Sequence, residues 1–73
     1  MAKYTIILEP NYPEKGYTVR VPALPGCITY GRTRAEALKR AKEVIEGFIE
    51  GLEKAGEPVP KEVAPVEMET ITV

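Results

Sequence analysis

The chain has 73 residues, a formal net charge of −1 and one cysteine, and it contains no His, Asp, Ser, Gln or Trp. This composition excludes a Ser–His catalytic triad, an internal disulfide and a zinc site built from clusters of Cys and His. A domain of this size hides only about 60% of the surface that its unfolded chain exposes, so we expect it to gain stability by self-association.

Charge and hydropathy narrow the function classes further. A net charge of −1 favours neither a general nucleic-acid binder nor a membrane-surface protein. The longest apolar run is Ile6-Ile7-Leu8, which is too short for a membrane span or a signal peptide. We therefore expect a cytoplasmic protein. One Asn and no Gln beside abundant Glu and Lys is a composition reported for thermophile proteins.

Three strands are predicted in the first 30 residues. Residues 3–8 and 17–21 alternate apolar and polar side chains, as half-buried antiparallel strands do. The loop between them ends at Gly16, which supplies the backbone freedom for entry into the second strand. Pro22 ends that strand, and after a Pro-Gly turn residues 27–30 return as a third strand. Short loops between consecutive strands predict an antiparallel meander.

Cys27 is the only side chain that could serve as a catalytic nucleophile. The chain has no imidazole to hold it as a thiolate, and its neighbours are apolar. We therefore interpret Cys27 as a small core residue. No Glu lies in an apolar setting that would tune it for acid–base chemistry. The chain is accordingly not expected to be an enzyme, and no cofactor or metal is predicted.

A long helix is predicted after the third strand. Thr33 and Glu36 form a capping-box pattern, and no proline follows until Pro58. The helix should run from residue 34 to about residue 55, with Gly56 as its left-handed stop. Its apolar residues recur at steps of three and four, at Leu38, Ala41, Ile45, Phe48 and Leu52. We expect this face to cover one side of the sheet.

The residues after the helix predict an extended connection and a last strand. Prolines interrupt residues 57–65, whereas residues 66–73 alternate without a clearly apolar face. Such a segment suits an edge strand or a strand that pairs with another subunit. The predicted fold is one α+β domain over residues 1–73, in the order β-β-β-α-β. Its core spans about residues 3–56, and its helix packs on one face of a small antiparallel sheet.

The strand entry, the turn and the helix start use a set of residues in a particular order and spacing. These residues are Gly16, Tyr17, Pro22, Leu24, Pro25, Gly26, Cys27, Gly31, Thr33, Glu36 and Ala37. With them, the segment from about residue 4 to residue 60 resembles the HicB-like antitoxin family. The resemblance implies that these residues are structural, and that the fold is a partial RNase H fold without catalytic carboxylates.

The same resemblance implies a function. Members of the HicB-like family are antitoxins that bind a small, basic HicA-type RNase, which is similar to a double-stranded-RNA-binding domain. They occlude the catalytic histidine or the RNA surface of that RNase. Acidic residues of this chain would complement such a toxin. The predicted partner contacts are Glu46, Glu50, Glu53, Glu67 and Glu69.

The charge order of the predicted helix is unusual. Residues 32–42 hold five bases and one acid, whereas residues 43–57 hold five acids and one base, which opposes the helix dipole. Local pairs at i,i+4 spacing would explain this order: Glu36–Arg40, Lys39–Glu43, Lys42–Glu46 and Glu50–Lys54. Alternatively, two such helices, or one helix and a complementary partner, could meet antiparallel so that a basic half faces an acidic half. Gly47 and Gly51 would then be the oligomer contacts that let a second backbone approach.

One feature of the family pattern is missing, and a second function remains open. Many family members carry a C-terminal DNA-binding module, but nothing after Gly56 predicts one, so DNA binding by this chain alone is not expected. The alternative to an antitoxin is a stand-alone homo-oligomeric binding or scaffold module without a toxin. The expected partners are therefore a second copy of the chain and a HicA-type toxin.

Overall fold

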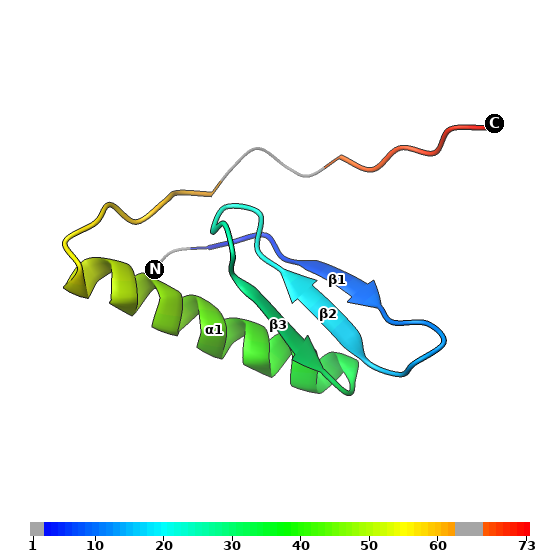
Figure 1. The fold of residues 1–73 in the computed structure, drawn as a ribbon, viewed down its shortest axis with the longest axis horizontal. Coiled ribbons are helices and arrows are strands. Elements are labelled where there is room, and N and C mark those ends of the chain that lie inside the picture. The colour runs from blue at the N-terminus through cyan, green and yellow to red at the C-terminus, as the bar shows by residue number, and fades with distance from the viewer. Residues whose placement is uncertain (1–2, 63–66) are drawn as a thin grey trace.

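The structure is a computed structural model that describes residues 3–62 and 67–73. It contains three strands and one helix: β1 (Ile7–Pro10), β2 (Tyr17–Arg20), β3 (Ile28–Gly31) and α1 (Arg34–Lys54). The strands form an antiparallel sheet in the order β1-β2-β3, and α1 packs against one face of it (Figure 1). This confirms the predicted meander followed by a helix. The first strand begins at Ile7, however, rather than at residue 3 as predicted.

The face of the sheet that meets α1 is set by the alternation of β2. Val19 lies opposite Leu8 on one side and Thr29 on the other. It is fully buried against Ala37 and Ala41 of the helix. α1 contacts β3 most extensively and β2 next. The small alanine side chains therefore let the first half of α1 lie close beneath the two later strands.

A second apolar cluster lies beyond the end of the sheet, where residues 21–27 fold back over the second half of α1. The Cys27 N–H donates to the Leu24 carbonyl at 2.9 Å, and the Val21 N–H donates to the Cys27 carbonyl at 3.1 Å. Leu24 is 0% and Cys27 2% exposed. The half-buried helix residues that cover this cluster are Val44, Ile45 and Phe48.

Both ends of α1 are closed by hydrogen bonds. Thr33 Oγ1 accepts from the Glu36 N–H at 3.1 Å, and Glu36 Oε1 accepts from the Arg32 N–H at 3.1 Å. At the other end, Gly56 has φ +70°, and the Glu57 N–H donates to the Leu52 carbonyl at 2.9 Å. This is a Schellman stop, in which glycine adopts the left-handed conformation at no steric cost. The predicted helix start and stop are confirmed.

The turn from β3 into α1 depends on a close approach of backbone to backbone. Gly31 is buried, and a Cβ built on it would lie 2.3 Å from the Ala37 backbone nitrogen. No larger residue fits there without a shift of the helix. Gly31 therefore determines how near the first turn of α1 lies to the end of β3.

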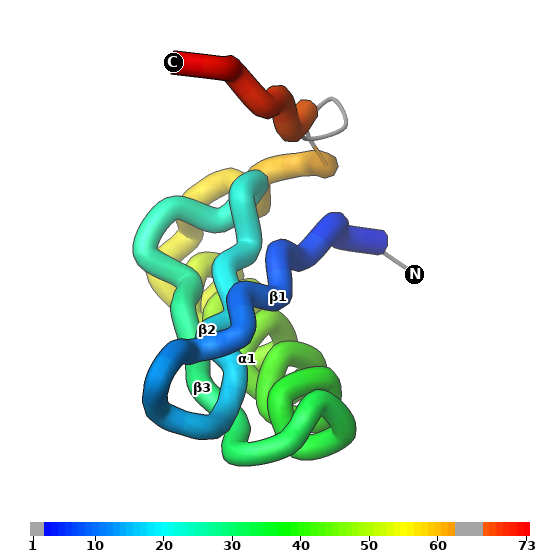
Figure 2. The backbone as a smooth tube through the Cα atoms, turned by 90° about the vertical axis from the view of Figure 1, so that its right-hand side faces the viewer, coloured from blue at the N-terminus to red at the C-terminus, as the bar shows by residue number. Residues whose placement is uncertain are grey.

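The predicted last strand is the main error. Residues 67–73 form no strand, and residue 66 lies outside the described part of the chain. Figures 1 and 2 show this C-terminal segment running clear of both the sheet and the helix. Its apolar residues are strongly exposed, with Met68 at 89% and Ile71 at 81%. Neither of its two faces is uniformly apolar, so the alternation does not favour one face for burial.

Candidate functional site

The sheet face opposite α1 is open. The register places Arg20 between Ile7 and Ile28, and Thr18 between Glu9 and Tyr30. Arg20 Nε donates to Glu9 Oε1 at 2.6 Å, in a pair whose side chains are 56% and 49% exposed. An exposed pair of this kind contributes only about 0–1 kcal/mol. The open face is therefore mixed in character, with one charge pair between apolar neighbours.

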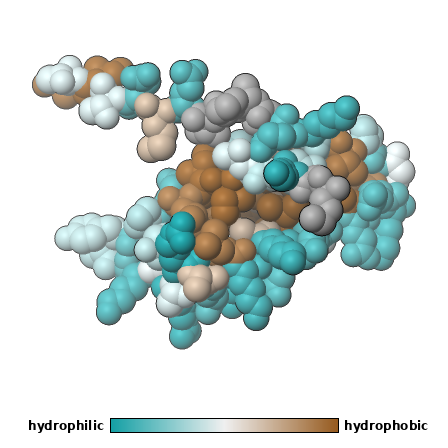
Figure 3. Space-filling model, turned by 180° about the vertical axis from the view of Figure 1, so that it is seen from behind, coloured by the Kyte–Doolittle hydropathy of each residue, from teal (hydrophilic) through white to brown (hydrophobic). Residues whose placement is uncertain are grey.

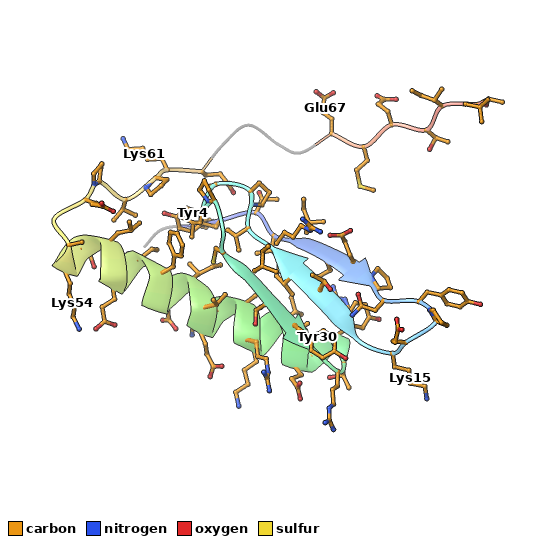
Figure 4. All side chains as sticks on the ribbon, viewed as in Figure 1. Tyr4, Lys15, Tyr30, Lys54, Lys61 and Glu67 are labelled. Carbon is orange, nitrogen blue, oxygen red and sulfur yellow. The ribbon has the colours of Figure 1, made fainter. Side chains whose placement is uncertain are left out.

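Tyr30 closes one end of this face. Its hydroxyl donates to the Lys15 carbonyl at 3.0 Å, and Figure 4 shows Tyr30 beside the β1–β2 hairpin. Gly16 has φ +110°, and a Cβ there would lie 2.4 Å from the Tyr30 hydroxyl oxygen. This hydrogen bond holds the Tyr30 side chain against the hairpin, although Tyr30 remains 44% exposed.

Three of the predicted partner contacts form one acidic stripe on α1. Glu46, Glu50 and Glu53 are spaced by four and three residues, so they share one side of the helix. All three are exposed. Glu50 Oε1 accepts from Lys54 Nζ at 3.1 Å, in a pair that is mostly solvent-exposed. The acidic stripe, defined by these three residues, is therefore a continuous surface feature of the second half of α1.

The predicted pairing of helix charges is only half formed. Of the four pairs, Glu36–Arg40 at 3.5 Å and Glu50–Lys54 at 3.1 Å are present. Lys39–Glu43 and Lys42–Glu46 make no ion pair within 4.0 Å, and all four of these residues belong to the described part of the chain. Local pairing accordingly explains part of the charge order and leaves the rest of it facing solvent.

The two other predicted partner contacts lie elsewhere. Glu67 and Glu69 are exposed on the C-terminal segment. Figure 4 shows Glu67 far from Lys54, the residue that pairs with Glu50 of the acidic stripe. This structure therefore does not bring the five predicted acids together in one site.

The two glycines predicted as oligomer contacts lie on an open part of α1. Gly47 and Gly51 are exposed, and a Cβ built on either would meet nothing within 4 Å. The chain itself therefore places no neighbour against them. A contact there with a second helix stays a prediction.

The positions of the family pattern have distinct locations. Two of these positions, Thr33 and Glu36, form the helix cap. Five others contribute to the interior or its margin: Tyr17, Leu24, Cys27, Gly31 and Ala37. Pro22 is half-buried, and the turn that follows exposes Pro25 and Gly26. Burial raises the pKa of the Cys27 thiol, which makes it a poor nucleophile at neutral pH.

Sequence reasoning missed an apolar groove between the N-terminal segment and α1. It is lined on one side by Tyr4 and Ile6 and on the other by one flank of the helix, comprising Leu38, Ala41, Lys42, Ile45, Glu46 and Ile49. Figure 3 shows apolar side chains gathered on this face of the molecule. The signal was available, because the apolar arc of α1 includes Leu38 and Ile49 on the flank away from β3. We refer to this feature as the flank groove.

The described residues contain neither a metal-ligand cluster nor a membrane-spanning helix. Within residues 3–62 and 67–73, no group of three or more His, Cys, Asp or Glu side chains could hold a metal ion. The same residues contain no helix with both the length and the apolar character needed to cross a bilayer.

Comparison with known proteins identifies the family. The family model described as the HicB-like antitoxin of bacterial toxin–antitoxin systems matches residues 4–72. The chain belongs to the HicB-like antitoxin family. Members of this family are generally non-catalytic, and the antitoxin role implies a toxin partner.

The relatives of this antitoxin-family chain are similar over different lengths. A UPF0150 protein of Thermoplasma acidophilum is 49% identical over 72 residues, which cover 97% of this chain and 96% of the relative. A UPF0150 protein of Synechocystis is 42% identical over 59 residues, covering 81% and 73%. A 14.9 kDa protein of Haemophilus phage HP1 is 48% identical over 46 residues, which make up 35% of that protein. The domain thus also resembles part of a longer chain.

Proposed function

We propose that this chain is an antitoxin that binds a small, basic HicA-type RNase and occludes it. The observation that carries the proposal is the acidic stripe of Glu46, Glu50 and Glu53, which lies exposed along one side of α1 in a chain of the antitoxin family. An RNase binds the phosphate backbone through basic residues. An acidic stripe is complementary to that basic surface.

Inhibition of this kind requires no chemistry from the antitoxin. By covering the RNA surface or the catalytic histidine of the toxin, the chain would exclude substrate. Glu67 and Glu69 would act as a second acidic element, since their exposed segment stands apart from the helix and can meet a different part of the toxin. The β-β-β-α order agrees with the partial RNase H fold that we propose for the chain.

Charge reversal tests the proposed contact surface. Glu46→Lys, Glu50→Lys and Glu53→Lys together should weaken toxin binding at least about tenfold, equivalent to about 1.4 kcal/mol. They should also flatten the salt dependence of the dissociation constant. The measurement is titration calorimetry at several salt concentrations with the purified toxin. Reversal of Glu67 and Glu69 forms a separate variant, so the two acidic elements can be ranked.

The control is Glu14→Lys, which reverses one exposed acid in the β1–β2 hairpin, away from α1, and it is compared with Glu53→Lys alone so that the change in charge is the same. It should leave the dissociation constant within about twofold of the unmodified chain. If the stripe variant and the control weaken binding equally, the stripe is not the contact surface. If neither reversal of the acidic elements changes affinity, the electrostatic basis of the proposal is wrong.

The second candidate function, a stand-alone homo-oligomeric module, is favoured by a different observation. The flank groove and the C-terminal segment both expose apolar side chains in the single chain. Recovery of the chain from its host only as a defined oligomer would support this function over the antitoxin.

A further inference from the structure

Two apolar features of this chain lack a partner within it. The flank groove presents Ile6, Leu38 and Ile49 between the N-terminal segment and α1. The C-terminal segment, residues 67–73, exposes Met68, Ile71 and Val73 almost completely. Exposed apolar groups of this kind mark interaction surfaces.

The sheet has a free edge beside the flank groove. Within the described residues, β1 pairs with β2 on one side only, so its outer edge offers unpaired backbone groups. Leu8 points to the helix side, together with Ile6 just before the strand, and both pack against the cluster of Val19, Ala37 and Ala41. An added strand along β1 would therefore place alternate side chains over the flank groove.

The sequence of the C-terminal segment has the alternation that such a strand needs. Glu69, Ile71 and Val73 share one face, whereas Met68, Thr70 and Thr72 share the other. With Ile71 and Val73 turned toward the flank groove, Glu69 faces the groove as well, and the groove carries one base, Lys42, and one acid, Glu46. The two apolar residues of this face thus match the apolar lining of the groove, and Lys42 offers Glu69 an opposite charge.

Residues 60–62, which precede the C-terminal segment in the sequence, are held near the N-terminal segment of their own chain. The Tyr4 hydroxyl donates to the Pro60 carbonyl at 2.6 Å, and the Thr5 hydroxyl donates to Glu62 Oε2 at 2.7 Å. From this anchor, residues 67–73 run away from their own sheet, as Figures 1 and 2 show. In a twofold dimer, each segment would project toward the other copy, so the exchange would be reciprocal.

We propose that residues 68–73 of one copy form a fourth strand along β1 of a second copy, with Ile71 and Val73 seated in the flank groove. Two such contacts form in the dimer, and each covers apolar surface that the single chain leaves in water. The inference is tested without the toxin, although it shares Glu46 of the groove and Glu69 of the segment with the proposed toxin contacts. It also accounts for the missing last strand, because that strand is completed between chains.

The oligomeric state tests the proposal. In light scattering after size exclusion, the full chain should have the mass of a dimer, and a chain that ends at residue 66 should have the mass of a monomer. Ile71→Asp with Val73→Asp should shift dissociation to at least tenfold higher concentration. The matched control, Thr70→Asp with Thr72→Asp, adds the same charge to the opposite face and should keep the dimer. Circular dichroism should show that each variant retains its helix.

Cross-linking between two different chains identifies which copy supplies the segment. One chain carries Ile71→Cys, and a second, tagged chain carries Leu38→Cys or Ile49→Cys at opposite ends of the groove. The native Cys27 is 2% exposed and is not expected to compete. Oxidation of the mixture should give a disulfide between tagged and untagged chains for at least one groove position.

Several outcomes would overturn the proposal. A monomeric full chain would do so, as would a dimer that survives loss of residues 67–73. A doubly substituted chain, Leu38→Cys or Ile49→Cys with Ile71→Cys, that cross-links only within itself would show that the segment covers its own groove. A groove that becomes protected only when a toxin is added would assign it to that partner instead.

Discussion

The two flanks of α1 are covered to very different degrees. On the β3 side, the first turn of the helix lies against Gly31, and the loop that carries Leu24 and Cys27 closes the far end. On the β1 side, the flank groove leaves Leu38 38% exposed. The same helix thus completes one interface within the chain and leaves the other open. The β3 side is therefore covered within the chain, whereas the β1 side is the flank that we propose for a partner.

The largest expected effect on stability comes from shortening a buried side chain on the β3 side of α1, compared with one on the β1 side. Leu24→Ala removes a fully buried side chain and should lower the free energy of unfolding by about 2–5 kcal/mol. Ile49→Ala removes a half-buried side chain of the flank groove and should cost clearly less in dilute solution. Urea denaturation at low and high protein concentration measures both. If the groove is an interface between copies, the cost of Ile49→Ala rises with concentration and that of Leu24→Ala does not.

Two glycine substitutions compare a closely packed position with an open one. Gly31→Ala should destabilise the fold, because its Cβ would collide with the Ala37 backbone. Gly51→Ala should stabilise an exposed helix position by up to about 1 kcal/mol, because alanine is the better helix former and its Cβ meets nothing there. Thermal unfolding of the two variants supplies the measurement. A loss of stability or of dimer mass in Gly51→Ala would instead support the predicted helix contact at Gly47 and Gly51.

The smallest effect concerns pH. Burial raises the pKa of Cys27, so above the ordinary thiol pKa of about 8.5 the unfolded chain binds fewer protons than the folded chain. The contribution of the neutral Cys27 thiol to the free energy of unfolding is therefore complete below that pH. It is lost as pH rises toward the raised pKa of the folded chain. Urea midpoints between pH 7 and pH 10 should fall more steeply for the unmodified chain than for Cys27→Ala. Parallel slopes would show that the thiol is not protected by burial.

Much of the fold follows from local signals in the sequence. The strand alternation, the Thr33 cap and the Gly56 stop each depend on neighbouring residues, and each is present in the structure. The missing strand and the flank groove depend on whether distant segments meet. Alternation in residues 66–73 indicates strand potential but does not specify a partner, and the pattern of Leu38 and Ile49 does not indicate how much of α1 a three-stranded sheet can cover.

The candidate site was predictable to a similar extent. The spacing of Glu46, Glu50 and Glu53 places them on one side of any helix, and the structure shows them exposed along α1. The position of Glu67 and Glu69 relative to that stripe depends on the course of the chain after the helix. Their separation from the stripe could not be derived from local spacing.

Inhibition of an RNase tests the central claim most directly. The tagged chain is purified from its host, any small basic protein bound to it is released in denaturant and refolded, and RNA cleavage is measured while the chain is added back. The account predicts that cleavage falls to zero near a fixed stoichiometric ratio, and that the variant with reversed Glu46, Glu50 and Glu53 requires more protein. A released protein that cleaves RNA equally well at every concentration of the chain would contradict it, as would a purification that yields only the chain itself.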